Sequence, residues 1–584
     1  MQITVIDLTA NKLPGVFVSL LLFFFVLGHA ACTDSRPVTE AIAAAETSRR
    51  LPTTAAVASA HPLATQAGTE ILEMGGNAFD AAVAVSAALG VVEPYSSGLG
   101  GGGFYLLHRE SDQMQIMIDG REVAPMAATH DMYLDEKGDP IPRLSVDGPM
   151  AAGIPGLPAA LVHIADKYGR LSLEQSLAPA IRYAQDGYPV TPRLRLGLQF
   201  KRDLIAASEA ASQVFLRDGQ VPELGTVIKQ PALGETLRLL TKNGADGFYR
   251  GELAQKLVTG NRDAGGIWTL EDLAGYRVIE RPPVVAEYKG VRVVTAPPPS
   301  SGGVVLVNTL NILSTFDLEN MDPMTAKHLL IESMRRSYRD RAEYLGDPDF
   351  VDIPMRKLLH PYYAAGQRIS IRFDRATPSD LLPGILPAGS GGTDTTHFSI
   401  LDKEGNRVGG TQSINFWFGS GFMPPDTGVL LNNEMDDFSL KPGVPNGYEL
   451  VGADANAIAP GKRMLSSMTP TFLESERGIA ILGTPGGSRI ISMVLLSSLA
   501  WVDGADAKEM VELRRFHHQY LPDQIFYEPG AMSESEKRSL QERGHELKES
   551  ERLYGNMQAI TWDFETGVVR AASDPRGEGE GLVY

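Results

Sequence analysis

Residues 394–406 read DTTHFSILDKEGN and form the most informative stretch of the chain. Side chains alternate from Thr395 to Leu401 as they do along a strand, residues 402–406 suit a hairpin turn, and residues 407–415 suit the returning strand. Residues 374–392 come directly before them, and their many prolines and glycines predict an accessible connection. We therefore expect a hairpin that begins directly after an exposed segment.

The rest of the chain mixes strand and helix patterns. Gly478 to Leu482 suits another strand, and Ser488 can cap an apolar helix that runs to about Trp501. Residues 81–92 are apolar on most sides, as expected of a buried helix. Both kinds of pattern recur in the two halves of the chain, which predicts an α/β architecture.

Composition excludes several classes of protein. The 584 residues include 53 basic and 71 acidic side chains, a net charge of −18 without a basic run, so nucleic acid is not an expected partner. Cys32 is the single cysteine, which excludes an internal disulfide and a cysteine-rich metal site. His517 and His518 are adjacent, so on a strand they point to opposite faces, and no third ligand is apparent. We expect no metal and no cofactor.

The N-terminal region has the features of an export signal. Residues 15–28 read GVFVSLLLFFFVLG, which suits a signal-peptide core better than a membrane span. Cleavage after Ala30 would suit a secretory signal, whereas cleavage before Cys32 would suit a lipoprotein with a lipid on that cysteine. We interpret residues 1–31 as the signal and residues 32–56 as a tether. The protein is therefore expected to be exported, either periplasmic or anchored to the envelope.

Two glycine-rich segments have different interpretations. Residues 98–103 read GLGGGG and satisfy G-x-G-x-x-G, but a strand pattern follows instead of a helix, which favours a tight backbone passage over a dinucleotide site. In GTPGGS, residues 483–488, Gly486 and Gly487 stand where a helix is expected to start. Backbone N–H groups at a helix start are unpaired and favour negative charge, which suits an oxyanion hole.

Eight short blocks occur together and in order along the chain. They are GGNAFDAAVA (75–84), GLGGGGF (98–104), DGREVAP (119–125), TTHFSILDKEGN (395–406), NNEMDDFS (432–439), KPGVPN (441–446), KRMLSSMTPT (462–471) and GTPGGSRI (483–490). With them, residues 57–584 resemble the γ-glutamyltransferase family of N-terminal nucleophile hydrolases. The resemblance implies a four-layer αββα fold and a precursor that is cut between Asp394 and Thr395. It also implies a heterodimer of a large subunit, residues 57–394, and a small catalytic subunit, residues 395–584.

The resemblance makes Thr395 the nucleophile. A threonine hydroxyl needs a base beside it, and cleavage would free the α-amine of Thr395 to take the proton. In the precursor, the same hydroxyl would attack the carbonyl of Asp394, and the resulting ester would be hydrolysed. Ser413 matches a position that threonine usually occupies in the family, so the hydroxyl that faces Thr395 is kept and a methyl group is missing. Gly486 and Gly487 match the oxyanion glycines.

The resemblance also implies a pocket for the α-carboxylate and the α-ammonium of a γ-glutamyl group. The carboxylate is assigned to a guanidinium and two hydroxyls, because a guanidinium fork matches a carboxylate; these are Arg121, Ser466 and Ser467. The ammonium is assigned to two carboxylates and an amide, which are Glu434, Asp437 and Asn415. Residues 441–456 resemble a lid found in part of the family, in which Tyr448 would reach Asn415 and shelter the acyl-enzyme.

The implied reaction is hydrolysis of the γ-glutamyl bond of glutathione and related compounds, with transfer of the group to amino acids or peptides. The alternatives of the same fold are a cephalosporin or glutaryl acylase and a poly-γ-glutamate transpeptidase. A glutaryl group brings no ammonium to Glu434 and Asp437, and a polymer suits a more open cleft than a lid allows. A binding protein that has lost catalysis is the alternative from another class. It would be expected to lack the nucleophile or the oxyanion glycines, all of which are present.

Overall fold

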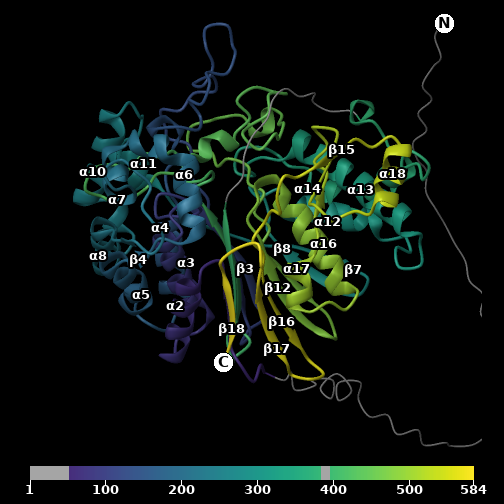
Figure 1. Ribbon diagram of the computed structural model, residues 1–584, viewed down its shortest axis with the longest axis horizontal. Helices are drawn as coiled ribbons and strands as arrows, with labels where there is room; N and C mark the ends of the chain where they lie inside the picture. Colours follow the sequence, from purple (N-terminus) through teal and green to yellow (C-terminus); the bar gives the residue numbers. More distant parts are fainter. Residues whose placement is uncertain (1–50, 383–394) are drawn as a thin grey trace, which may run out of the picture. The chain divides into compact units, whose positions relative to one another are not determined.

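The computed structural model describes residues 51–382 and 395–584. Two antiparallel sheets lie face to face in the described part of the chain, with helices on both outer faces (Figure 1). The first sheet has the strand order β18 (Glu580–Val583), β1 (Ala56–Ser59), β9 (Thr396–Leu401), β10 (Arg407–Ser413), β2 (Gly102–Arg109), β3 (Met114–Gly120) and β6 (Ile279–Arg281). The second has the order β17 (Val569–Ser573), β16 (Gln558–Asp563), β12 (Gly478–Gly483), β11 (Thr471–Glu474), β8 (Val291–Thr295) and β7 (Val284–Tyr288).

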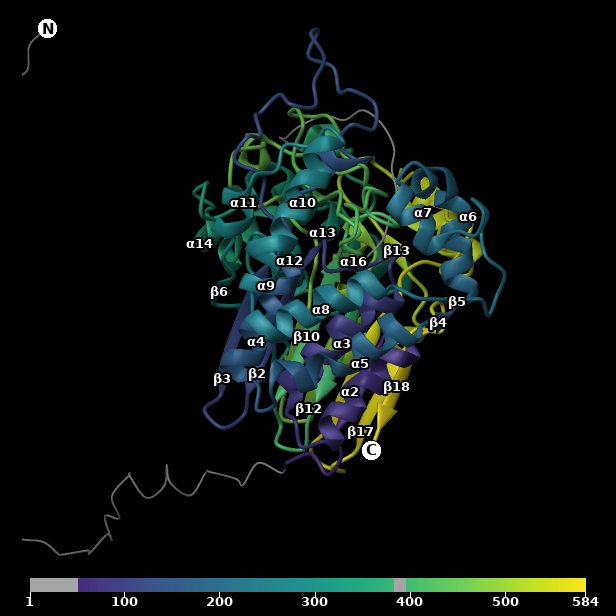
Figure 2. The ribbon, with the colours of Figure 1, turned by 90° about the vertical axis from the view of Figure 1, so that its left-hand side faces the viewer.

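The two helical layers come from different stretches of the chain. The layer on the first sheet faces the viewer in Figure 2 and consists of α2 (Pro62–Glu73), α3 (Ala78–Val92), α4 (Leu157–Tyr168), α5 (Leu173–Asp186), α6 (Pro192–Ala206), α7 (Glu209–Phe215), α8 (Pro231–Asn243), α9 (Asp246–Tyr249), α10 (Gly251–Asp263) and α11 (Leu270–Gly275). The layer on the second sheet consists of α12 (Gly302–Leu313), α13 (Pro323–Tyr344), α14 (Met355–Leu358), α15 (Pro361–Ile369), α16 (Ile490–Val502), α17 (Ala507–Glu512) and α18 (Glu534–Glu542). The predicted four-layer αββα arrangement is confirmed.

Short elements connect these layers. A two-stranded sheet joins β4 (Tyr188–Pro189) to β5 (Val227–Ile228), and a three-stranded sheet contains β13 (Phe516–His517), β14 (Ile525–Tyr527) and β15 (Leu547–Glu549). Single 3-10 turns are η1 (Pro149–Ala151), η2 (Ser379–Leu381), η3 (Glu434–Asp437), η4 (Asp454–Asn456) and η5 (Gly487–Arg489).

The period-two pattern of the strands builds the core. On β2, Phe104 and Leu106 pack between the two sheets, whereas Tyr105 and Leu107 pack against the first helical layer. Successive side chains of a strand point to opposite faces, so a strand between two apolar layers is apolar on both sides. All seven residues of β10 are also buried between these layers, although most of them are polar or glycine. The hairpin formed by β9 and β10 therefore lies among the buried inner strands of the sandwich, so the residues at its ends are attached to a well-packed part of the fold.

Most of the local predictions are confirmed. The buried helix is α3, whose capping box joins Asn77 and Asp80. The first glycine segment is a tight backbone passage: a Cβ on Gly100 would lie 2.1 Å from the carbonyl oxygen of Leu430, and one on Gly101 would lie 2.0 Å from that of Ser413. The strand that follows is β2, so the geometry of a dinucleotide-binding turn is not present there.

The predicted cap at Ser488 is wrong. Helix α16 begins at Ile490, its N-cap is Arg489, and no side chain makes the capping hydrogen bond. Ser488 instead lies inside η5, where its carbonyl oxygen accepts a hydrogen bond from the Tyr338 hydroxyl at 2.5 Å. The preceding glycine, Gly487, has a φ of +57°, and this left-handed residue adds a tight turn before the regular helix.

Several predictions concern residues that lie outside the described part of the chain. These are the export signal, the lipid site at Cys32, most of the tether and the cleavage position at Asp394. The last residue of the predicted tether, Ala56, is buried and begins β1. Within residues 51–382 and 395–584, no helix is both long and apolar enough to cross a membrane.

Candidate active site

The candidate catalytic residues gather at one end of the sandwich. Thr395 stands directly before β9, Ser413 ends β10, and Arg121 follows β3. Because neighbouring strands are antiparallel, the start of β9 lies beside the end of β10 and close to the end of β3. On the second sheet, the end of β12 and the start of β11 meet in the same way. The sheet topology therefore brings residues from distant parts of the sequence together at the same end of the strands.

A pocket with about 300 Å³ of empty volume lies at this end of the strands. Predicted and unpredicted residues line it together. The lining residues are Arg121, Arg341, Thr395, Ser413, Asn415, Glu434, Asp437, Tyr448, Leu450, Ser466, Ser467, Met468, Gly487 and Ile490. Every substrate-binding residue expected from the sequence is among them. Of the four expected catalytic residues, Gly486 is the one that does not line the pocket, although it is the neighbour of Gly487.

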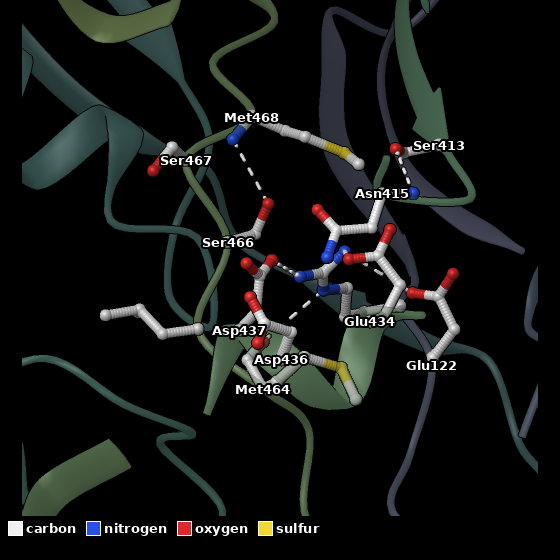
Figure 3. Close-up of polar contacts among 12 residues, drawn as sticks. Glu122, Ser413, Asn415, Glu434, Asp436, Asp437, Met464, Ser466, Ser467 and Met468 are labelled. Carbon is white, nitrogen blue, oxygen red and sulfur yellow. Dashed lines mark hydrogen bonds and ion pairs between the residues drawn. The ribbon is translucent and has the colours of Figure 1, made fainter. Parts of the chain in front are cut away.

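Thr395 is buried, with 5% of its surface exposed, and its hydroxyl donates to the Ser413 hydroxyl at 3.4 Å. Ser413 Oγ also accepts the backbone N–H of Asn415 at 2.7 Å, as Figure 3 shows. Asn415 has a φ of +74°, so the chain turns sharply where β10 ends. That turn holds the hydroxyl of Ser413 and the amide side chain of Asn415 in one pocket.

Tyr448 lines the pocket from the segment predicted to be a lid. Its hydroxyl donates to Asn415 Oδ1 at 2.5 Å, which is the contact that the resemblance implies. Its ring packs on Gly487: a Cβ on that glycine would lie 2.3 Å from two ring carbons of Tyr448. Side chains of this size fit here only because residue 487 has none. The lid and the glycine turn therefore form one contact surface.

Arg121 lies at the centre of an acidic cluster. Its guanidinium pairs with Glu434 at 2.8 Å and with Asp437 at 2.5 Å, and a third carboxylate, that of Glu122, lies at 3.4 Å. The three carboxylates converge on one guanidinium in Figure 3. The 3-10 turn η3 presents both Glu434 and Asp437, because three residues make one turn and put them on the same side. Arg121, Glu122 and Glu434 are almost completely buried.

Burial changes the pKa values of the charged groups in this cluster. Burial opposes the charge of Arg121, but Glu434, Glu122 and Asp437 together raise its pKa above the ordinary value. Burial raises the pKa of Glu122 to about 7, against the attraction of Arg121. It raises the pKa values of Glu434 and Asp437 as well. Arg121 therefore stays charged, and the site holds more carboxylates than it can fully ionise without a further cation.

Arg341 is a pocket residue that the sequence analysis missed. It stands in the last turn of α13, where its Nε donates to Ser301 Oγ at 2.9 Å and its Nη2 donates to Ser467 Oγ at 3.3 Å. Burial lowers its pKa to about 10. Arg341 belongs to none of the recognised blocks, and α13 contains three other arginines, so the sequence alone does not distinguish it.

The two adjacent histidines have ordinary partners. His517 contacts Ser492 through Nδ1 at 2.9 Å and Gln519 through Nε2 at 2.8 Å. His518 contacts Asp523 through Nε2 at 3.2 Å and accepts the N–H of Tyr520 through Nδ1. No group of three or more His, Cys, Asp or Glu side chains in the described ranges could hold a metal ion.

Comparisons with known proteins identify relatives over most of the chain. A family model described as gamma-glutamyltranspeptidase matches residues 64–584. The chain is 41% identical over 526 residues to a glutathione hydrolase proenzyme of Escherichia coli (strain K12), covering 89% of this chain and 90% of the relative. It is 42% identical over 497 residues to one of Pseudomonas sp. (strain A14), covering 84% and 86%.

Solved structures share the fold. A cephalosporin acylase from Bacillus halodurans aligns with a TM-score of 0.79 at 31% identity, over 91% of this chain and 96% of that chain. A chain of the Helicobacter pylori gamma-glutamyltranspeptidase aligns with a TM-score of 0.54 at 38% identity, over 56% of this chain and 93% of that chain. The family model and the relatives both span most of the sequence. The chain belongs to the γ-glutamyltranspeptidase family of N-terminal nucleophile hydrolases, enzymes that hydrolyse γ-glutamyl bonds and transfer the γ-glutamyl group.

Proposed function

We propose that this chain cuts itself between Asp394 and Thr395 and then uses Thr395 to hydrolyse or transfer the γ-glutamyl group of glutathione and related donors. The position of Thr395 carries the proposal. It stands at the head of a central strand, within a pocket that also contains arginines and carboxylates for both charged ends of an amino acid. A donor bound between these charges would present its side-chain carbonyl to the threonine hydroxyl.

The same hydroxyl performs both reactions. In the precursor it attacks the carbonyl carbon of Asp394, the peptide C–N bond breaks, and the α-amine of Thr395 takes the proton. Water then hydrolyses the resulting ester, which leaves a carboxylate on Asp394 and the hydroxyl on Thr395. This separates residues 57–394 from residues 395–584 as a large and a small subunit. The freed amine is then the base that the mature nucleophile needs.

In the catalytic cycle, the Thr395 hydroxyl attacks the γ-carbonyl carbon of the donor and passes its proton to the α-amine. The N–H groups of Gly486 and Gly487 stabilise the oxyanion. The C–N bond breaks, the departing amine takes the proton, and a γ-glutamyl ester remains on Thr395 Oγ1. Water releases glutamate from this ester, whereas the amine of an amino acid or dipeptide gives a new γ-glutamyl amide.

The charged walls support an amino acid donor. Glu434 and Asp437 offer carboxylates to an α-ammonium, with Asn415 beside them, and Ser466 and Ser467 offer hydroxyls to an α-carboxylate. A cation beside Glu434 and Asp437 would also compensate the excess of negative charge around Arg121. A diacid would leave those carboxylates without this cation, which is why γ-glutamyl donors are favoured over glutaryl donors.

Export and assembly complete the proposal. The apolar core at residues 15–28 supports export to the periplasm or the envelope, with Cys32 as the site of a lipid if cleavage occurs before it. The two subunits remain together as a heterodimer. Their strands alternate within the first sheet, where β1 of the large subunit lies between β18 and β9 of the small subunit.

A comparison of two chromogenic anilides tests the substrate and the nucleophile together. The γ-glutamyl and glutaryl anilides differ only in the α-amino group, and each is assayed with the purified mature protein and with Thr395→Ala. We expect γ-glutamyl turnover to exceed glutaryl turnover by at least about 100-fold, since a buried carboxylate pair loses its cation in the second case.

Thr395→Ala is expected to remain a single uncut chain on a denaturing gel and to be inactive. Thr395→Ser, which keeps the hydroxyl, is the matched control and should still be cut. A preference for glutaryl anilide would replace the proposed donor by that of an acylase. Cutting of Thr395→Ala at the same bond would contradict the self-cleavage mechanism.

A further inference from the structure

Arg341 is a buried cation in the pocket wall, and no carboxylate among the described residues forms an ion pair with it. Its exposed fraction is 5%. Other buried arginines have such partners: Arg335 pairs with Asp523, Arg407 with Glu474 and Arg515 with Asp574. Burying a charge without an opposite charge is unfavourable by several kcal/mol. The position of Arg341 in the pocket wall is therefore expected to matter most when an anionic group occupies the pocket.

The hydroxyls next to Arg341 are arranged as donors. Ser466 Oγ accepts the backbone N–H of Met468 at 3.1 Å, as Figure 3 shows, and Ser467 Oγ accepts Nη2 of Arg341 at 3.3 Å. Within residues 51–382 and 395–584, neither serine donates its own O–H to an acceptor. This wall offers the hydrogen-bond donors of two O–H groups and a guanidinium, and it offers no partner for a cation. It therefore favours an anion that accepts hydrogen bonds.

Arg121 alone is a weak source of positive charge for a carboxylate. Its two terminal nitrogens are already paired with Glu434 and Asp437, and Glu122 lies near them. Three carboxylates around one guanidinium outnumber its single positive charge, which suits a further ammonium and leaves little positive charge for a carboxylate. A second cation is needed if a zwitterionic amino acid is to bind, and Arg341 is the other arginine among the lining residues of the pocket.

We propose that Arg341 is a positioning residue for the α-carboxylate of the donor, acting through Ser467. Its Nη2 holds the oxygen of Ser467 so that the hydroxyl proton faces the pocket, and its charge lies behind that hydroxyl. The donor ligand is thus an α-amino acid derivative whose carboxylate meets the hydroxyls of Ser466 and Ser467, with the charge of Arg341 behind Ser467. This inference rests on the function proposed above and names the residue that selects for the carboxylate.

A third anilide separates the effect of the α-carboxylate on turnover from the effect of the amine. The 4-aminobutyryl anilide keeps the amine of the γ-glutamyl compound and lacks its α-carboxylate, whereas the glutaryl anilide keeps the carboxylate and lacks the amine. All three are assayed with the wild type, Arg341→Met, Arg341→Lys, Ser467→Ala and the double variant Arg341→Met with Ser467→Ala. Arg339→Met is the control, because Arg339 stands on the same helix, pairs with Asp340 and does not line the pocket.

The expected pattern depends on the carboxylate. For Arg341→Met, kcat/KM should fall about 100-fold with the γ-glutamyl and glutaryl anilides, mainly through KM, and should change less than about 3-fold with the 4-aminobutyryl anilide. Arg341→Lys keeps the charge without the planar fork and should lose about 10-fold. Ser467→Ala should add little to the loss in Arg341→Met, because residues that act through one another are not additive.

A merely structural role would give a different pattern. A cation in the last turn of a helix also stabilises it, so loss of Arg341 could weaken α13 and reduce turnover of every anilide equally. Equal losses for the three anilides, or no loss with the carboxylate-bearing pair, would overturn the inference. The proposed function fails by a separate result, which is a wild type that prefers the glutaryl to the γ-glutamyl anilide.

Discussion

The hydroxyl of Thr395 donates to the hydroxyl of Ser413 across 3.4 Å, from the start of one strand to the end of its neighbour. The same Ser413 oxygen accepts the N–H of Asn415 at 2.7 Å, so its place is fixed by the backbone. The distance between the two hydroxyls is long for a hydrogen bond, as is common for catalytic pairs without substrate. Ser413 is thus held in place beside Thr395, the proposed nucleophile.

Removal of the Ser413 hydroxyl should slow the chemical step. We expect Ser413→Ala to lower kcat for the γ-glutamyl anilide by about 10- to 100-fold, with a smaller change in KM, because a hydrogen bond to the nucleophile is lost. Ser413→Thr keeps the hydroxyl and adds the methyl group that the family usually has, so its activity should match or exceed that of the wild type. An active Ser413→Ala would show that Thr395 needs no orienting hydroxyl.

Tyr448 is expected to act through Asn415. The Tyr448→Phe variant removes the 2.5 Å bond to Asn415 Oδ1 and leaves the ring in place. A loss of about 1–2 kcal/mol predicts a 5- to 30-fold fall in kcat/KM for the γ-glutamyl anilide, because Asn415 Oδ1 loses its hydrogen-bond donor while Nδ2 keeps its bond to the Asn433 carbonyl oxygen. Tyr133→Phe is the control, since it removes a tyrosine hydroxyl that bonds Met150 O away from the pocket. Equal effects of the two variants would contradict the role of Tyr448.

Substitution of Gly487 should displace the lid. Gly487→Ala places a Cβ 2.3 Å from the Tyr448 ring and adds a side chain at a φ of +57°. The backbone strain alone is about 1–2 kcal/mol, and the clash moves either the ring or the oxyanion turn. We expect kcat to fall at least about 100-fold. Gly567→Ala measures the strain alone, because Gly567 has a φ of +71° and no atom near the added Cβ. Similar activity of both variants would disprove the lid contact.

The acidic cluster makes the stability of the unoccupied enzyme depend on pH. Burial raises the pKa of Glu122 from its ordinary value of 4.5 to about 7, so the folded protein binds this proton more tightly than the unfolded chain. The resulting stabilisation is present below pH 4.5 and is lost as the pH rises to about 7.

The melting temperature should therefore fall over this range in the wild type and fall less in Glu122→Gln. Melting curves between pH 4.5 and pH 8 test this, with Glu235→Gln, at an exposed ion pair with Arg238, as the control. The prediction concerns the free enzyme, because a bound ammonium would stabilise the ionised carboxylates. Parallel curves for the wild type and Glu122→Gln would contradict it.

The sequence predicted the helices and strands whose position depends on the pattern of apolar and polar residues along the chain. Residues 81–92 and the strand after Thr395 follow from periodicity, since their apolar faces have no alternative to burial. The prediction of a cap at Ser488 was wrong because, although a serine before an apolar run suits a cap, the two glycines before it turn the chain first. Arg341 was missed because its role depends on where the last turn of α13 meets Ser467, and these residues are 126 positions apart.

The order of the strands has a consequence for how the molecule is made. In the first sheet β18, β9 and β10 come from residues after the proposed cut, and β1, β2, β3 and β6 come from residues before it, in alternating groups. Neither fragment can complete this sheet alone, and the proposed self-cleavage requires the sheet to form while the chain is still continuous. After cleavage the same hydrogen bonds preserve a structure whose separated parts face a bimolecular search to rebuild it. The mature enzyme would then owe its persistence to slow unfolding, and its denaturation would be a one-way event.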